Sequence, residues 1–286
     1  MSQAVKHESQ IQETTFETIS VRKEGAILFA EILAPPMNLL GPELVRDLVS
    51  LIQQTEADDT VQVLVFKSGD PDYFIAHVDV TRIIEYRGAA ARLTGEPSLA
   101  MLFRHLSTSR LVTIAQIEGR VRGAGSEFVL ACDMRFAASE SAIFGQLEAA
   151  FGLMQGGGGI QHLTRLMGRG RALEVLLSAE DYNAELAERY GWINRALPAT
   201  ALGDFVKSIA HRIANFPAAG RVVIKERVNG IALAPAEEFR RDSDLFLDCA
   251  HNPESQRLTE TAMKRGFQNR NAEMNLDCML GELVQQ

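Results

Sequence analysis

The chain has 286 residues, which is enough to bury a complete core as one large domain or two small ones. Its formal net charge of −8 argues against a nucleic-acid binder that neutralises phosphates, while its 46% apolar and 23% charged residues are ordinary for a globular protein. No apolar run reaches the roughly 18 residues of a membrane span, and the polar N-terminus lacks a signal-peptide core. The three cysteines are too widely spaced for a zinc motif or a disulfide framework. We therefore expect a cytoplasmic enzyme that binds neither nucleic acid nor membranes.

The first half of the chain mixes predicted strands and helices. Residues 1–15 are polar and are expected to form a disordered tail, whereas the alternating residues 16–21 and the apolar residues 26–33 predict a β-hairpin. Pro42 stands where a first helical turn tolerates proline, and the apolar spacing after it predicts an amphipathic helix. Residues 80–96 are expected to line or cover a pocket. Strands are further predicted over 61–66, 111–117 and 134–137, a helix over 98–106, and a strand-to-helix turn over 119–125.

Helical periodicity dominates the chain after residue 160. The change from strand-bearing to all-helical sequence near residue 200 predicts two parts. Residues 16–200 are expected to form the core that carries the site, and residues 201–286 a helical C-terminal subdomain. The predicted helices cover 160–166, 171–177, 184–190, 202–214, 218–228, 236–250 and 254–265.

Two glutamates in small or apolar surroundings are the main candidates for chemistry. Glu127 follows the small residues GAGS and opens the apolar run FVLA, while Glu148 follows FGQL. A carboxyl group in such surroundings must find partners or raise its pKa, and a carboxyl that titrates near neutral pH can give or take a proton. Each glutamate also has a plainer explanation. The charge of Glu127 suits the first turn of any helix, and Glu148 suits a solvated loop.

Other motifs argue against several classes of site. The six histidines are not paired at metal-ligand spacing, so no metal site is expected. Ser126 does not match the G-x-S-x-G nucleophile motif. The four glycines at 156–159 lack the lysine of a phosphate-binding loop and the spacing of a dinucleotide-binding fold. Their flexibility instead predicts a close approach of the backbone to a ligand.

The segment from Gly123 to Glu180 resembles the centre of the crotonase (enoyl-CoA hydratase/isomerase) superfamily. In that family a small-residue turn carries a first catalytic glutamate, and a Cys-Asp pair, a strand, FGQPE with a second glutamate and a PGxGGxQRL helix start follow. This chain has GAGSE, Cys132-Asp133, FGQLE and QGGGGIQHL at the matching places. The likeness covers roughly residues 16 to 235 and includes both glutamates.

The resemblance implies a fold, an assembly and a set of roles. The α/β fold would be a spiral of ββα repeats, and its helical C-terminal subdomain would cover the pocket and mediate assembly into a homotrimer or a dimer of trimers. Glu127 and Glu148 would be the catalytic acid–base pair. The backbone N–H groups of Val78 and Ala124 would form an oxyanion hole. Water or substrate would contact Ala76, His77 and Gly156.

Three departures from the family pattern weaken parts of this assignment. His77 replaces a glycine that is usual in the FxAGxDL loop, and a positive φ there would strain a histidine. Lys264 and Arg265 only approximate the basic segment that meets the phosphates of coenzyme A in the family, and an exposed helix face is the favoured explanation for them. The basic residue that often precedes the N-terminal Asn-Ala-Leu of the family is missing. The last two departures concern the anchoring of coenzyme A, and none of the three removes either glutamate.

The favoured function is the addition of water across the 2,3 double bond of an enoyl-CoA thioester. Glu127 would deprotonate the water, Glu148 would supply the proton at Cα, and no cofactor would be needed because coenzyme A is part of the substrate. One alternative is an isomerase that shifts a double bond with Glu148 as the single base. Another is a hydrolase of carbon–carbon bonds in diketones that uses His77. The last is a non-catalytic binding protein that keeps the fold.

Overall fold

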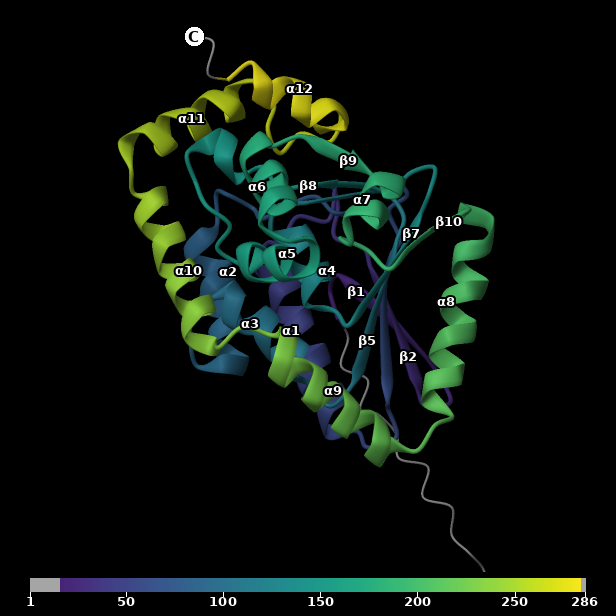
Figure 1. Ribbon diagram of the computed structural model, residues 1–286. Coiled ribbons are helices and arrows are strands. Elements are labelled where there is room, and N and C mark those ends of the chain that lie inside the picture. The colour runs from purple at the N-terminus through teal and green to yellow at the C-terminus, as the bar shows by residue number, and fades with distance from the viewer. Residues whose placement is uncertain (1–15, 284–286) are drawn as a thin grey trace, which may run out of the picture.

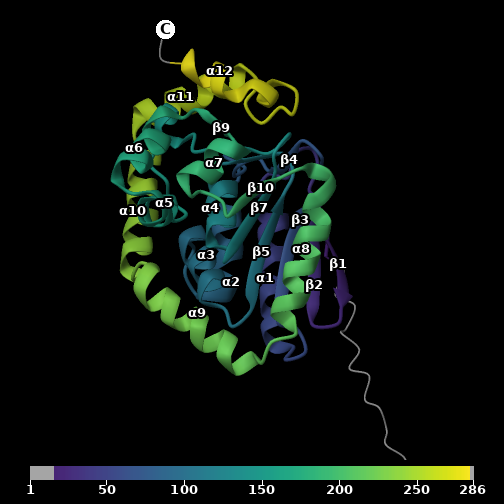
Figure 2. The same ribbon diagram turned by 45° about the vertical axis from the view of Figure 1, so that its right-hand side comes forward.

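The computed structural model describes residues 16–283. The tail expected over residues 1–15 lies outside these described residues. Within them, a large sheet is packed between helices, and a small sheet lies at one end of it (Figure 1). Helices of the C-terminal third run along the outside of the molecule (Figure 2).

The large sheet has six strands in the order β1-β2-β3-β5-β7-β10. Strands β1 and β2 are antiparallel and form the predicted hairpin, and every later neighbour pair is parallel. Side chains alternate between its faces, so Ile27 and Phe29 pack toward one core cluster and Leu28 and Ala30 toward another. The strands are β1 (Ile19–Glu24), β2 (Ile27–Ile32), β3 (Val63–Ser68), β5 (Val112–Ile117), β7 (Met134–Ala138) and β10 (Arg195–Leu197).

The small sheet has the order β4-β6-β8-β9 and is made of three-residue strands. Its strands are β4 (Tyr73–Ile75), β6 (Arg120–Arg122), β8 (Ile143–Gly145) and β9 (Asp181–Asn183). The expectation of an uninterrupted turn over 119–125 is therefore wrong, because β6 occupies its centre. Segments this short show no readable period-2 pattern, which is why the sequence does not predict this sheet.

The helices cover both faces of the large sheet. Helix α8 covers one face, and α1 to α4 pack on the other (Figure 2). Helices α9 to α12 then follow one another around the outside, from the end of α8 to the end of the molecule that carries the small sheet (Figure 1). The helices are α1 (Pro42–Ala57), α2 (Ile83–Thr94), α3 (Leu99–Thr108), α4 (Ala124–Ala131), α5 (Gly159–Met167), α6 (Arg169–Ser178), α7 (Ala184–Tyr190), α8 (Ala199–Ala214), α9 (Ala218–Ala232), α10 (Ala236–Ala250), α11 (Pro253–Lys264) and α12 (Leu276–Gly281), with 3-10 turns η1 (Glu148–Phe151) and η2 (Ala272–Asn275).

The helical segments were largely predicted by periodicity. Residues 80–96 contain α2, whose residues Ile83, Tyr86 and Arg87 line a cavity, as expected for this stretch.

Among the helices of residues 16–283, none combines the length and the apolar character that a membrane crossing requires.

Candidate active site

Helix α4 places Glu127 in its first turn, as predicted. Gly123 enters the helix with a φ of +48°, a conformation that favours glycine. The next glycine, Gly125, lets the helix touch β4, because a Cβ at this position would overlap the carbonyl oxygen of Ile75. Phe128 then anchors the helix in the core through edge contacts with Phe66 and Phe103, at centroid distances of 5.0 and 5.7 Å. The side chain of Glu127 is held on a rigid, closely packed element.

The glycine-rich loop before α5 holds the carboxylate of Glu127. Its Oε1 accepts hydrogen bonds from the N–H groups of Gly157 and Gly159, both at 2.8 Å. A Cβ on Gly157 would overlap Oε2 of Glu127, so any larger residue here would displace the carboxylate. The backbone approach predicted for residues 156–159 is therefore an approach to Glu127. Gly156 itself lines the cavity and lies against Phe246 of α10.

Glu148 begins the short turn η1 and is also buried, with 6% of its surface exposed. The alternative of a solvated loop carboxylate is wrong. Its one side-chain partner among the described residues is Gln155, whose Nε2 lies 3.4 Å from Oε2. Gly123 leaves room beside the carboxyl group, because a Cβ there would lie 3.0 Å from Oε1 of Glu148.

Both glutamates line one cavity of about 340 Å³. His77, Val78 and Ala124 form another part of its wall. The C-terminal helices close it from outside, with Phe246 and Ala250 from α10 and Ser255, Gln256, Thr259 and Glu260 from α11. Residues more than 100 positions apart in the chain thus meet around the two acids.

Burial sets the proton affinities of the two carboxyl groups. Burial raises the pKa of Glu127 to about 7, against the opposing effect of the hydrogen bonds from Gly159 and Gly157. Burial also raises the pKa of Glu148 to about 8, and the neighbouring charge of Glu127 adds to the shift. The two loop N–H groups favour the ionised form of Glu127, whereas the charge of Glu127 disfavours ionisation of Glu148. Two carboxyl groups with different proton affinities can act as a base and an acid in one site.

Two residues that line this cavity have backbone N–H groups without a protein acceptor in the described chain. Leu40 forms a parallel bridge with Val78, in which Leu40 N–H donates to His77 O at 2.8 Å and Asp79 N–H donates to Leu40 O at 3.3 Å. The N–H of Val78 therefore points away from Leu40. Within residues 16–283, neither Val78 N–H nor Ala124 N–H donates to a protein acceptor. Both residues line the cavity, and Ala124 is the first residue of α4, where the helix dipole is positive.

The other predicted contact residues have different surroundings. Ala76 is fully buried and packs with Met37 and Tyr73 behind the cavity wall. His77 does line the cavity, and its φ is not positive, so the strain that glycine would avoid does not arise. Its ring is 1% exposed and is bonded on both nitrogens, to Val78 O at 2.7 Å and to Glu273 Oε1 at 2.9 Å.

Glu273 is the residue near this site that the sequence did not indicate. It is fully buried in η2, in a polar stretch (NRNAEMN) that carries no periodic signal and resembles no family motif. Lys264 and Arg265, which the sequence did indicate, do not line the cavity. Lys264 is exposed, and Arg265 lies 3.7 Å from Glu282. Over residues 16–283, no three metal-ligating side chains are grouped to hold an ion.

Comparison with known proteins places the chain in a family. The family model described as enoyl-CoA hydratase/isomerase matches residues 22–270. A short-chain-enoyl-CoA hydratase of Clostridium acetobutylicum is 30% identical over 260 residues, which cover 88% of this chain and 98% of the relative. A crotonyl-CoA hydratase of Syntrophomonas wolfei is 32% identical over 199 residues, which cover 69% of this chain and 76% of the relative.

A solved structure gives the same result for the fold. The crystal structure of a Streptomyces avermitilis protein, named as a candidate enoyl-CoA hydratase, is 49% identical and superposes with a TM-score of 0.91. The superposition covers 93% of this chain and 97% of that chain. The fold is therefore the crotonase fold predicted from the central motif. The chain belongs to the enoyl-CoA hydratase/isomerase family of enzymes.

Proposed function

We propose that this protein adds water across the 2,3 double bond of an enoyl-CoA thioester. The observation that carries the proposal is the pair of buried carboxyl groups with raised pKa values in one cavity, beside two amide N–H groups that have no protein acceptor among residues 16–283. A hydro-lyase needs a base for the water, an acid for the carbon skeleton and donors for the thioester oxygen. The cavity offers each of these.

The roles follow from the proton affinities. Ionised Glu127 orients a water molecule and takes its proton as the oxygen bonds to Cβ of the substrate. Protonated Glu148 delivers its proton to Cα. The N–H groups of Val78 and Ala124 stabilise the negative charge that develops on the thioester oxygen, and one such donor typically contributes about 3 kcal/mol. The pair starts with one proton on Glu148 and ends with one on Glu127, so the protons balance over the step.

The relatives' names support a short acyl chain. The two relatives described above are named as hydratases of short-chain enoyl-CoA and of crotonyl-CoA. Crotonyl-CoA is therefore the proposed test substrate, and coenzyme A enters as part of it without a separate cofactor. Gly156 lines the cavity and is proposed to contact the substrate or the water, whereas Ala76, which does not line it, is not part of the proposed site.

The alternatives are less well supported. An isomerase would use Glu148 alone and would give no task to Glu127, although two backbone N–H groups orient that carboxylate. A diketone hydrolase using His77 would need a free ring nitrogen, and both are bonded. A non-catalytic binding protein would have no reason to keep two carboxyl groups buried near neutral pKa values.

The assembly proposed from the family resemblance is a homotrimer or a dimer of trimers. Helix α9 supports it, because none of its residues is buried and several are large and apolar. Val223 and Ile231 are 56% and 81% exposed. Apolar side chains gathered on one helix favour contact with another copy of the chain.

The proposal is tested by the hydration of crotonyl-CoA, followed through the loss of the enoyl-thioester absorbance. Glu148→Gln should lower kcat by roughly a thousandfold and leave substrate affinity nearly unchanged, because the amide keeps the shape but cannot donate the proton. Glu185→Gln is the matched control, since Glu185 is an exposed acid in the first turn of α7. Retained turnover in Glu148→Gln would refute the acid role, and no turnover in the unmodified protein would refute the proposed reaction.

A further inference from the structure

His77 links an active-site amide to the far end of the chain. Its Nδ1 lies 2.7 Å from the carbonyl oxygen of Val78, and its Nε2 lies 2.9 and 3.0 Å from the two carboxylate oxygens of Glu273. The ring stacks on Phe267 at a centroid distance of 4.4 Å and an interplanar angle of 8°. His77 and Glu273 are 1% and 0% exposed, so water does not compete for these bonds.

The partners determine where the protons are. A carbonyl oxygen only accepts hydrogen bonds, so Nδ1 of His77 carries a proton and donates it to Val78 O. Oε1 of Glu273 also accepts from the N–H of Gln268 at 2.6 Å. Nε2 of His77 lies against the same carboxylate, so the ring cannot turn without breaking two bonds.

The bond to Val78 O restrains the amide that faces the cavity. His77 precedes Val78, so the bond from its side chain to the Val78 carbonyl closes a small ring of atoms that contains the Val78 nitrogen. This closed ring restrains the direction of the Val78 N–H. The bridge to Leu40 also holds the peptide groups on either side of Val78, through the His77 carbonyl and the Asp79 N–H.

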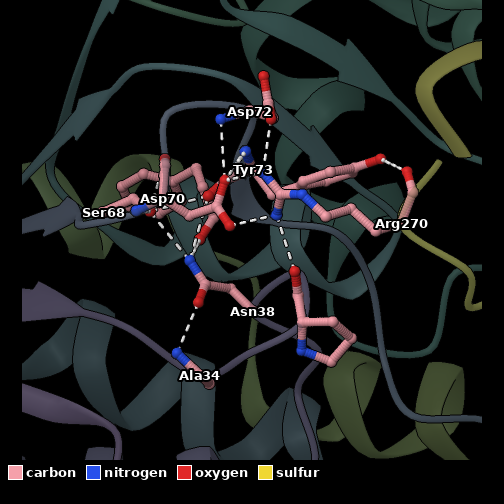
Figure 3. A network of polar contacts seen from close by, with 9 residues as sticks. Ala34, Asn38, Ser68, Asp70, Asp72, Tyr73 and Arg270 are labelled. Carbon is pink, nitrogen blue, oxygen red and sulfur yellow. Dashed lines mark hydrogen bonds and ion pairs between the residues drawn. The ribbon is translucent and has the colours of Figure 1, made fainter.

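The segment that carries Glu273 is itself fixed to the same region. Arg270 pairs with Asp70 and Asp72 and donates to the carbonyl oxygen of Pro36 at 2.7 Å (Figure 3). The hydroxyl of Tyr73 donates to Arg270 O at 2.7 Å. These contacts join the C-terminal segment to the loop before β4 and to Tyr73, the first residue of β4. Tyr73 lies four residues before His77.

A buried arginine holds the other side of Glu273. Nη1 of Arg122 donates to the backbone carbonyl of Glu273 at 2.9 Å, and the same guanidinium pairs with Asp181. Arg122 ends β6, directly before the turn into α4. The segment around Glu273 is thus held by β4, which precedes Val78, and by β6, which precedes Ala124.

We infer that His77 is a positioning residue for the Val78 N–H, and that Glu273 of the C-terminal segment holds His77 in place. The inference rests on the proposed function, because it assigns the Val78 N–H to the thioester oxygen. A positioning role for His77 and Glu273 makes a different prediction from a purely structural one. A structural role predicts lost stability, whereas positioning predicts a loss of transition-state stabilisation in protein that remains folded.

Substitution of His77 by asparagine or by glutamine tests its two hydrogen bonds, to Val78 O and to Glu273, separately. In His77→Asn the side-chain nitrogen can occupy the place of Nδ1 and donate to Val78 O, but the side chain is too short for Glu273. In His77→Gln the nitrogen can reach toward Glu273 but not back to Val78 O. His77→Ala removes both bonds. The chain offers a matched control in His105→Ala, because His105 forms a half-exposed pair with Glu56 at 3.0 Å, away from the cavity residues.

The measurements are kcat and KM for crotonyl-CoA, with folding checked by circular dichroism and thermal unfolding. His77→Ala and His77→Gln should lower kcat by about ten- to a hundredfold with little change in KM, since a displaced donor acts mainly on the transition state. His77→Asn should recover most of the loss. His105→Ala should keep the unmodified kcat. Glu273→Ala should lower kcat in the same direction, and the loss in the double variant with His77→Ala should be clearly smaller than the product of the single losses.

Acetoacetyl-CoA supplies a spectroscopic readout that does not depend on turnover. Its enolate absorbs in the near ultraviolet and carries the negative charge that the two amides would stabilise. The unmodified protein and His105→Ala should favour the bound enolate, His77→Asn should favour it nearly as much, and His77→Ala should favour it less at equal occupancy. Equal enolate fractions in all folded variants, or an Asn variant no better than Ala, would overturn the inference. Absent turnover and absent binding in the unmodified protein would instead refute the proposed function.

Discussion

The two candidate acids differ in what surrounds each carboxylate. Glu127 accepts two short hydrogen bonds from backbone N–H groups, which stabilise its ionised form. The one side-chain partner of Glu148 among the described residues is Gln155, at 3.4 Å, and the carboxyl group lies near the charge of Glu127. Glu148 therefore keeps its proton to a higher pH. The assignment of base and acid depends on this difference.

The same difference predicts the pH dependence of the reaction. The active form carries one proton on the pair, so kcat/KM should fall at low pH, where both groups are protonated, and at high pH, where both are ionised. Burial raises the pKa of Glu127 to about 7 and that of Glu148 to about 8, so the maximum should lie at neutral to slightly alkaline pH and not in the acidic range of free carboxyl groups. Because the groups interact, the two limbs report the pair and not the single residues. Initial rates with crotonyl-CoA across this range test the prediction, and a profile without a falling limb at high pH would contradict it.

Among the larger elements, the glycine-rich loop before α5 holds the base. A methyl group on Gly157 would overlap Oε2 of Glu127, which is the movable end of a side chain. Gly157→Ala should therefore displace the carboxylate and lower kcat by about a hundredfold, with only a small loss of stability. Gly170→Ala in α6 is the control, because its added methyl group meets open space. It should leave kcat unchanged and stabilise the helix by about 0.5–1 kcal/mol. Equal kcat values in both variants would show that the loop does not position Glu127.

The elements also show what the sequence could predict. The hairpin, the first-turn position of Glu127 and most helices were predicted, because they depend on local patterns several residues long. The small sheet was not predicted, because three-residue strands such as β6 form only when distant segments pair. The burial of Glu148 was left open for the same reason, since Ser255 and other residues of the C-terminal helices complete its cavity.

The partners of single residues were the least predictable feature. His77 stood out as a departure from a family motif, but nothing in the sequence pointed to its partner. Glu273 lies 196 positions later, and Arg270, which fixes the segment, pairs with Asp70 exactly 200 positions away. Such contacts arise from the overall path of the chain, which a motif does not encode.

At the scale of the whole molecule, the C-terminal helices have two different relations to the rest. Helices α10 and α11 contribute walls to the cavity, while α9 stands partly away from the body (Figure 2). Lys225 of α9 donates to Asp133 at 2.8 Å, and Asn229 donates to Ser107 O at 2.8 Å. A second hollow of about 750 Å³ lies beside these polar contacts and is lined by apolar residues of α9, including Ile224. It is larger than the cavity with the two acids, but neither glutamate lines it.

The exposed apolar residues of α9 lead to a prediction about assembly. If this helix packs against another copy of the chain, Val223→Glu combined with Ile231→Glu places charges in that contact and should shift the oligomer toward monomers, since an unpaired buried charge is strongly unfavourable. The control is Ile84→Glu, which puts the same charge on an isoleucine of α2 that is 89% exposed. Light scattering coupled to size-exclusion chromatography measures the mass of each variant. An unchanged mass in the α9 variant, or an unmodified protein that is already monomeric, would contradict the proposed role of α9. Because α9 leads directly into α10, whose Phe246 lies against Gly156, loss of the assembly should also lower the affinity for crotonyl-CoA.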